Sequence, residues 1–157
     1  MQNPTVTHAA FTIERHYPAP LDRLYRAFTE PSQKRDWFAG GKSSTLEEFT
    51  MDFRPGGHDY TRTRFPPGSP FPGAALENHT VYQDIVANQR IVLAYTMSVA
   101  GRRISASLAT FEFFSTPTGS MLLFTEQAAF FEGADGAAMR EDGWNQLLNS
   151  LAAHLAA

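Results

Sequence analysis

The chain has 157 residues, no cysteine and a net charge of -3, with a pI near 5.9. This length suits one domain, so we expect a single domain over residues 1–157. The acidic balance argues against nucleic acid and anionic membranes as partners, and the lack of cysteine excludes disulfides and fits a cytoplasmic protein.

The first third of the chain predicts a strand followed by two short helices. Residues 1–8 are polar, lack a signal-peptide pattern and are expected to form a flexible tail. From Phe11 apolar and polar residues alternate as in a strand, until the prolines that begin at Pro18. Helical spacing then connects Leu21, Leu24, Tyr25 and Phe28.

Pro31 is expected to end this helix, because the residue before a proline disfavours helical geometry. Ser32 can cap a short second turn that carries Trp37 and Phe38. Gly40-Gly41 should break that turn.

The middle of the chain predicts six strands without an intervening helix, which is typical of an antiparallel meander. The segment 66–73 contains four prolines and two glycines and is expected to form a loop or flap. No apolar run approaches about 18 residues, so no membrane span is expected. The strands are expected at residues 46–53, 58–65, 77–86, 90–98, 104–115 and 119–131.

The last stretch, residues 135–157, predicts a long helix with one apolar face. Asp135 can cap its start, Met139 extends the apolar stripe, and Arg140 falls off it. A one-faced helix after a run of strands is expected to lie on their sheet. The stripe consists of Trp144, Leu147, Leu148, Leu151 and Leu155.

Alternation along the strands predicts which side chains face this helix, because successive residues of a strand point to opposite faces. Rich aromatic content, with thirteen phenylalanines, suits either a core or an apolar cavity. The expected inward sets are Met51 and Phe53; Ile91, Leu93, Tyr95 and Met97; Ser105, Ser107, Ala109, Phe111 and Phe113; and Leu122, Phe124, Glu126, Ala128 and Phe130.

Glu126 is the most informative inward residue, because a charged carboxylate costs several kcal/mol to bury alone. It must be paired, hydrogen-bonded or protonated with a raised pKa. One hypothesis is that Glu126 anchors a ligand or acts as an acid/base group. The other is that it meets water or an arginine such as Arg54 or Arg62 near the strand end.

The remaining polar candidates are weaker. His58 and His79 are more typical of solvated or satisfied histidines, and Tyr82 and Tyr95 of tyrosines bonded to backbone. The sequence contains no metal-ligand spacing, dinucleotide or phosphate-binding loop, or nucleophile elbow. No metal or other cofactor is therefore expected.

Several motifs in this order resemble the START-like helix-grip (SRPBCC) superfamily, and within it the branch of the activator of heat-shock-protein-90 ATPase homologues. The resemblance covers about Phe11 to Leu155 and is to the C-terminal domain of that co-chaperone. The co-chaperone's activating N-terminal domain has no counterpart in these residues. The motifs are Tyr17-Pro18-Ala19-Pro20, Ala27-Phe28-Thr29-Glu30-Pro31, Trp37-Phe38, Arg54-Pro55-Gly56-Gly57, Tyr82 to Ile85, Arg90-Ile91-Val92, Gly101-Arg102-Arg103-Ile104-Ser105, Leu122 to Gln127 and Gly143-Trp144.

The resemblance implies an α+β helix-grip fold: a curved antiparallel sheet of about seven strands wrapped round a long C-terminal helix, with two short helices after the first strand and an internal cavity. It also places Trp37 and Phe38 near the cavity mouth. The fold alone does not specify an activity. Together with the alternation, it predicts a cavity lined by Trp37, Phe38, Phe53, Tyr95, Met97, Ser107, Phe111, Phe113, Phe124, Glu126, Phe130, Trp144 and Leu148.

Three functions are compatible with these features. The first is binding of a small, mostly hydrophobic molecule with one polar group near Glu126, since ligand pockets are mostly apolar with few polar groups. The second is an enzyme of the polyketide-cyclase or hydrolase kind with Glu126 as acid/base group. The third is a stress-related co-chaperone with a chaperone as partner.

The outward strand faces are more apolar than a solvated face requires, and such a patch commonly marks an interface. We therefore also expect a homodimer. The outward apolar residues are Val92, Ala94, Leu108, Met121 and Leu123.

Overall fold

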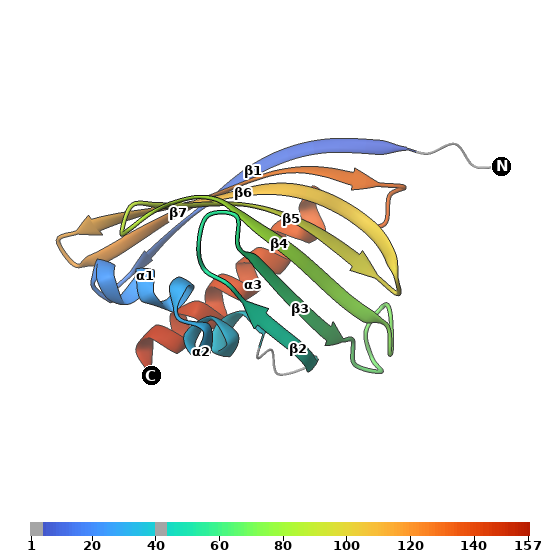
Figure 1. Cartoon of the computed structure of the whole chain (residues 1–157), viewed down its shortest axis with the longest axis horizontal. Helices are drawn as coiled ribbons and strands as arrows, with labels where there is room; N and C mark the ends of the chain where they lie inside the picture. Colours follow the sequence, from blue (N-terminus) through green and yellow to red (C-terminus); the bar gives the residue numbers. More distant parts are fainter. Residues whose placement is uncertain (1–4, 40–43) are drawn as a thin grey trace.

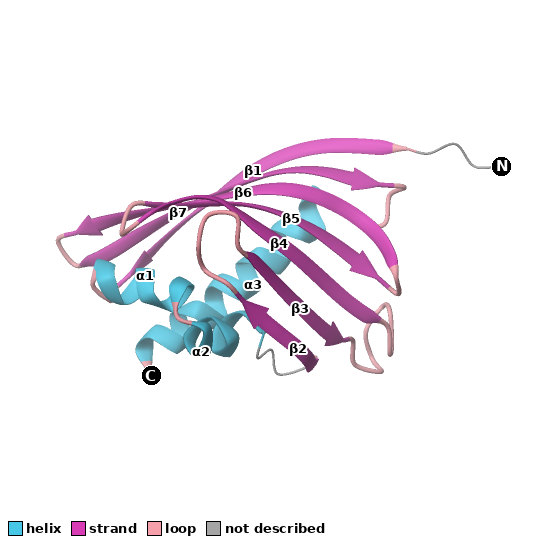
Figure 2. Cartoon of the chain, in the orientation of Figure 1, coloured by secondary structure: helices cyan, strands magenta, loops and turns pink. Residues whose placement is uncertain are grey.

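The computed structural model describes residues 5–39 and 44–157. Its elements follow the order expected from the sequence (Figures 1 and 2). They are β1 (Val6–Tyr17), α1 (Leu21–Thr29), α2 (Pro31–Lys34), the π-helical turn η1 (Arg35–Ala39), β2 (Thr45–Met51), β3 (His58–Arg64), β4 (Ala75–Val86), β5 (Arg90–Val99), β6 (Arg102–Thr116), β7 (Gly119–Phe131) and α3 (Ala137–Ala156).

The seven strands form one antiparallel sheet in the order β1-β7-β6-β5-β4-β3-β2. The first strand pairs with the last, with Ile13 opposite Phe124, while the other neighbours are successive hairpins. Figure 1 shows the sheet curving over α3, with α1 and α2 near the C-terminal end of that helix. The helix-grip fold predicted from the sequence is confirmed.

The core lies between the sheet and α3, where the inward side chains of the strands pack against the apolar face of the helix. Leu122, Phe124 and Phe130 are fully buried on β7, as are Leu148 and Leu151 on α3. The aromatic residues pack ring against ring, with the Phe124 and Trp144 centroids 4.4 Å apart. The inward faces predicted for β5, β6 and β7 are confirmed.

The N-terminal boundaries differ from the expectation in two places. Residues 6–8 belong to β1, where Val6 pairs with Phe131, so the predicted tail over residues 1–8 is wrong for them. Residues 1–4 and Gly40-Gly41 lie outside the described residues. Glu30, not Ser32, is the N-cap of α2, because Pro31 occupies the first helical position, where its missing N–H costs nothing.

The start of α3 also differs from the expectation. Gly136 is the N-cap and makes no side-chain capping bond, because the Asp135 carboxylate accepts hydrogen bonds from Arg140 instead. Met139 does not extend the buried stripe; it is 60% exposed. Arg140, which the stripe pattern excluded, is buried at 5% exposure.

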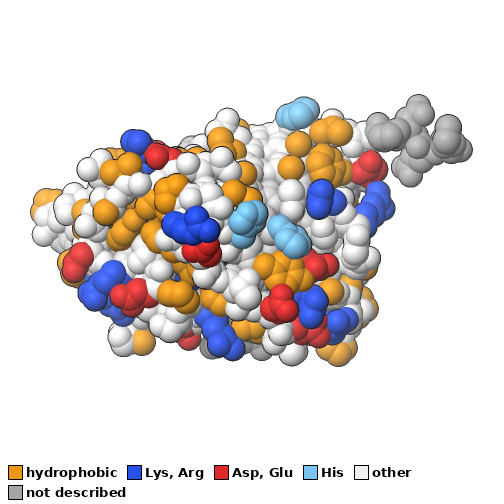
Figure 3. Space-filling view, in the orientation of Figure 1, with side chains coloured by type: hydrophobic (Ala, Val, Ile, Leu, Met, Phe, Trp, Pro, Cys, Tyr) orange, Lys and Arg blue, Asp and Glu red, His pale blue; other side chains and the backbone are white. Residues whose placement is uncertain are grey.

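The outer face of the sheet is partly apolar. Val92, Ala94, Met121 and Leu123 are half-buried and Leu108 is exposed, so the homodimer stays a prediction. On the face seen in Figure 3, acidic and basic side chains are interspersed among hydrophobic ones. Among the helices of the described residues, none has the length and hydropathy needed to cross a membrane.

Candidate functional site

A cavity of about 850 Å³ lies between the sheet and the helices. Side chains of β3, β4 and β5 form one side, and side chains of η1 and α3 form the other. Phe65 and Phe71, whose rings are 5.8 Å apart, contribute from the loop after β3. β2 and β3 form the edge of the sheet farthest from β1, and β3 is among the strands that line the cavity.

Part of the predicted lining set lies on the cavity wall. These residues are Trp37, Phe38, Tyr95, Met97, Phe111 and Trp144. In the part of the chain that the structure describes, the other predicted residues do not line the cavity. They are Phe53, Ser107, Phe113, Phe124, Glu126, Phe130 and Leu148.

The residues away from the wall pack against other side chains. Phe53 contacts the rings of Tyr25 and Tyr82, and Phe113 packs between α1 and the sheet beside Phe28. Alternation predicts that a side chain points inward, but it does not distinguish a residue covered by a helix from one that faces a cavity.

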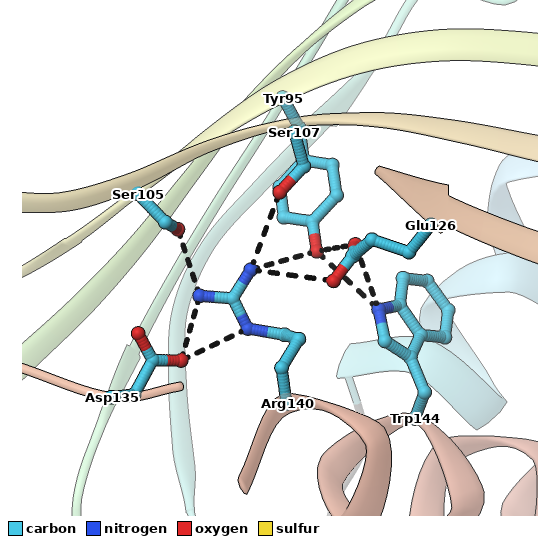
Figure 4. A network of polar contacts seen from close by, with 7 residues as sticks. All are labelled: Tyr95, Ser105, Ser107, Glu126, Asp135, Arg140 and Trp144. Atoms are coloured by element: carbon cyan, nitrogen blue, oxygen red, sulfur yellow. Dashed lines mark hydrogen bonds and ion pairs between the residues drawn. The ribbon is translucent and has the colours of Figure 1, made fainter. Parts of the chain in front are cut away.

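Arg140 connects α3 to the sheet (Figure 4). Its Nη2 donates to Ser105 Oγ at 2.7 Å and to Asp135 Oδ2 at 2.8 Å, and its Nε reaches the same Asp135 oxygen at 3.1 Å. Its Nη1 donates to the Tyr95 hydroxyl at 3.0 Å and to Ser107 Oγ at 3.5 Å. One guanidinium therefore joins β5, β6 and the loop before α3.

Glu126 lies behind this guanidinium and is fully buried. Its Oε1 accepts hydrogen bonds from the Tyr95 hydroxyl and, at 3.3 Å, from Trp144 Nε1. Its Oε2 lies 3.7 Å from Arg140 Nη1, in an ion pair. The arginine that pairs with Glu126 is thus on α3, whereas Arg54 pairs with Asp52 and Arg62 with Glu47.

We name Glu126, Asp135 and Arg140, with Tyr95 and Trp144, the Arg140 cluster. It holds two carboxylates and one guanidinium. Within the described residues, Glu126 Oε2 and Asp135 Oδ1 are buried without a hydrogen-bond donor. The cluster is therefore short of positive charge and of donors.

The electrostatics of the cluster follow from this burial. Desolvation raises the pKa of Glu126, although the Tyr95 hydrogen bond, the Arg140 charge and the Trp144 N–H lower it. Burial, followed by the charge of Glu126, also raises the pKa of the Tyr95 phenol. Desolvation opposes the charged form of Arg140, but Tyr95, Asp135 and Glu126 outweigh it and raise its pKa.

Arg140 is the residue that the sequence interpretation missed. Arg140 precedes Trp144 by four residues, and residues i and i+4 share a helix face. This spacing was a usable signal that Arg140 lies on the buried face of the helix. A charged residue on the buried face, together with an inward Glu126 on a strand, is a pattern that favours a buried ion pair.

Replacing Glu126 with glutamine tests the raised pKa. The wild-type carboxyl has a folded pKa above its ordinary value of 4.5, so its stabilising contribution is complete below about that pH and is lost as pH rises through the folded pKa. We expect Glu126→Gln to remain folded with a similar melting temperature near pH 7 and to lose less stability than wild type as pH rises.

Urea unfolding at a series of pH values checks this prediction. Glu112→Gln is the matched control, because Glu112 lies on the outward side of β6. If wild type and Glu126→Gln show the same dependence on pH, the Glu126 carboxyl does not have a raised pKa.

A second buried polar cluster joins α2 to the sheet. Lys34 Nζ donates to Asp59 Oδ2 at 3.0 Å and to the Tyr82 hydroxyl at 3.2 Å, and Tyr82 donates to the same Asp59 oxygen. The Lys34 ammonium also lies 5.3 Å from the centre of the Phe38 ring. Lys34 and Tyr82 line the cavity.

The histidines singled out from the sequence lie away from the cavity wall. His58 is exposed at the start of β3, and the His79 ring packs at a tilt against the Tyr60 ring, with centroids 4.6 Å apart. His154 lines the cavity instead and pairs with Asp36 at 2.6 Å. In residues 5–39 and 44–157 no group of three or more His, Cys, Asp or Glu side chains could hold a metal ion.

The curved sheet closed over a C-terminal helix, with a cavity beside that helix, defines a helix-grip domain of the START-like class. The chain belongs to the family described as "Activator of Hsp90 ATPase homolog 1-like protein", whose model matches residues 18–156. This membership supports a ligand-binding domain in general terms.

Solved structures of similar chains agree with this assignment. A protein from Rhizobium leguminosarum is 36% identical, with a TM-score of 0.91 and 98% of each chain covered. The Mll3558 protein from Rhizobium loti is 41% identical, with a TM-score of 0.84 over 96% of this chain and 99% of its own. An AHSA1-like protein from Aeromonas hydrophila is 18% identical, with a TM-score of 0.70 over 94% and 92%, and shows the fold alone. No curated protein matches the chain.

Proposed function

We propose that this protein binds a small, mostly hydrophobic molecule in the cavity between the sheet and α3. The observation that carries the proposal is the cavity itself, about 850 Å³ in volume and lined by aromatic and aliphatic side chains from both sides. Ligand sites are typically concave spaces of this size with predominantly apolar walls and a few polar groups.

Tyr95 and Arg140 are the proposed polar contacts at the α3 side, because both line the cavity. Glu126 acts behind them: it holds the Tyr95 hydroxyl and the Trp144 indole by hydrogen bonds to one oxygen. A side chain fixed in this way loses little further freedom when a ligand arrives, which favours binding.

Filling the cavity tests the proposal, with pyrene as an apolar fluorescent probe. Met97 on β5 and Leu147 on α3 line the cavity from its two sides. We expect Met97→Trp/Leu147→Trp to weaken pyrene binding at least about tenfold, or about 1.4 kcal/mol, because two indoles occupy the space of the ligand.

Thr96→Trp/Asp142→Trp is the matched control, since neither residue lines the cavity. It adds the same indoles to the same strand and helix and should bind pyrene as wild type does. Equal affinity of the two double variants, or no binding by wild type, would refute the proposed function.

Other expectations from the sequence stay predictions. Tyr95 faces the cavity and donates a hydrogen bond to Glu126. This pair favours an acid/base enzyme as the second candidate function. A single domain, a cytoplasmic location, a co-chaperone role and a homodimer also stay predictions.

A further inference from the structure

Two neighbouring parts of the cavity wall differ in polarity. Strand alternation brings hydroxyl and amide groups to its β3–β4 side, and we name Thr61, Thr63, Asn78 and Thr80 the polar strip. The neighbouring wall from β5 and β6 is largely hydrocarbon apart from the Tyr95 phenol, whereas α3 contributes apolar side chains together with Arg140, Gln146, Ser150 and His154. The apolar lining residues of these three elements include Ile91, Leu93, Met97, Val99, Ile104, Phe111 and Leu147.

Strand register makes the polar strip continuous. Thr61 pairs directly with Asn78, and Thr80 pairs with Tyr95 on the next strand. Directly opposite residues of an antiparallel pair have Cβ atoms about 4.5–5.5 Å apart, and residues two apart on one strand share a face. The strip therefore leads from the Tyr95 phenol across β4 to β3.

Among residues 5–39 and 44–157, no side chain of the polar strip makes a hydrogen bond to another part of the chain. Within the described part of the chain, the side-chain hydrogen bonds of β3 and β4 belong to their other polar residues. Thr61 is nevertheless buried at 5% exposure and lines the cavity. Among the described residues, the buried polar atoms without a partner do not include any from the polar strip, so its hydroxyl and amide groups are open to the cavity and can bond a molecule there.

Lys34 adds a donor beside the strip. An ammonium group carries three N–H donors, and Lys34 uses two of them on Asp59 and Tyr82. Asp59 pairs with Thr80 and lies two residues from Thr61, so this ammonium lies next to the strip. Hydroxyl, amide and ammonium groups together favour oxygen atoms as ligand partners, because oxygen accepts from all of them.

We propose that the ligand is an amphipathic molecule with oxygen groups, such as hydroxyls or carbonyls, along one edge. That edge lies against Thr61, Asn78 and Thr80, and the apolar face lies against the hydrocarbon side chains of β5 and β6 and against Leu147 of α3. This inference rests on the proposed function and specifies the chemistry of the ligand.

Fluorescence titrations with pyrene and 1-pyrenemethanol test the inference, because the two probes differ by one hydroxymethyl group. Thr61→Val/Thr80→Val keeps the branched shape of both strand residues and removes both hydroxyls. Loss of one neutral hydrogen bond corresponds to roughly a threefold to tenfold change. We expect the double variant to weaken the binding of 1-pyrenemethanol by that factor relative to the binding of pyrene.

Thr96→Val is the control, because Thr96 lies on β5 but not on the cavity wall. It should leave the ratio of the two affinities unchanged. If circular dichroism shows that the Thr61→Val/Thr80→Val variant does not fold, the single variants Thr80→Val and Asn78→Leu replace it. In each of them the ratio of the 1-pyrenemethanol affinity to the pyrene affinity should fall below that of wild type.

The outcomes separate this inference from the proposed function. Binding of pyrene by wild type, with an affinity ratio that the valine variants leave unchanged, overturns the inference and keeps the proposed function. An equal weakening of both probes shows only a change of cavity shape and also overturns it. No binding of pyrene by wild type overturns both.

Discussion

Arg140→Met is expected to lower the free energy of unfolding by about 3–5 kcal/mol near pH 7. The guanidinium is buried and supplies the only positive charge of the Arg140 cluster, which otherwise holds Glu126 and Asp135. Removing one partner of a buried ion pair costs more than the pair itself contributes, because it leaves uncompensated charge in a medium of low polarity.

The loss should depend on pH in a definite direction. Arg140 is one of the groups that lower the pKa of Glu126, so its removal raises that pKa further. A raised carboxyl pKa stabilises the fold below the ordinary pKa and loses that effect as pH rises through the folded pKa. The deficit of Arg140→Met should therefore be smaller near pH 5 than near pH 7.

Urea unfolding of four proteins checks the size and the cause of this loss. Arg102→Met is the matched control: Arg102 is exposed and pairs with Glu132 at 3.8 Å, so its replacement should cost at most about 1 kcal/mol. Adding Glu126→Gln to Arg140→Met should recover part of the stability, because it removes an unpaired carboxylate. No recovery, together with a loss like that of Arg102→Met, would show that the Arg140 cluster does not stabilise the fold.

Trp144→Ala is expected to lower the free energy of unfolding by about 3–5 kcal/mol, as for other buried large aromatic residues. The indole lies where α3 meets the sheet, with ring centroids 4.4 Å from Phe124 and 5.7 Å from Phe111. Its Nε1 also donates to the Tyr95 hydroxyl and to Glu126, each at 3.3 Å. Alanine would leave a void and deprive Glu126 of a donor.

Trp37 remains as a fluorescent reporter in this variant, so the same urea titration applies. Met139→Ala is the control on the same helix, because Met139 is exposed. Trp144→Phe keeps a ring but lacks the N–H, and should fall between wild type and Trp144→Ala. A loss below about 1 kcal/mol for Trp144→Ala would contradict the position of the indole in the core.

The order of the elements and the inward faces of the central strands could be predicted from the sequence, because both depend on local periodicity. Leu122, Phe124 and Glu126 alternate with outward residues, and the register of one strand determines the face of all three. Trp144 and Leu148 share a helical face for an equally local reason. The direction of each side chain therefore needed no knowledge of its distant neighbours.

The surroundings of those side chains depended on tertiary structure. The curvature of the sheet and the path of α3 decide that Tyr95 faces the cavity while Phe124 and Glu126 are covered. The helical pattern can place Arg140 on the buried face of α3 and the strand pattern places Glu126 inward, but only the packing of α3 on the sheet brings the two together. The polar strip likewise depends on the long-range register that places Thr61 opposite Asn78 and Thr80 opposite Tyr95. Contacts between residues far apart in the chain arise from packing of whole elements, which periodicity does not encode.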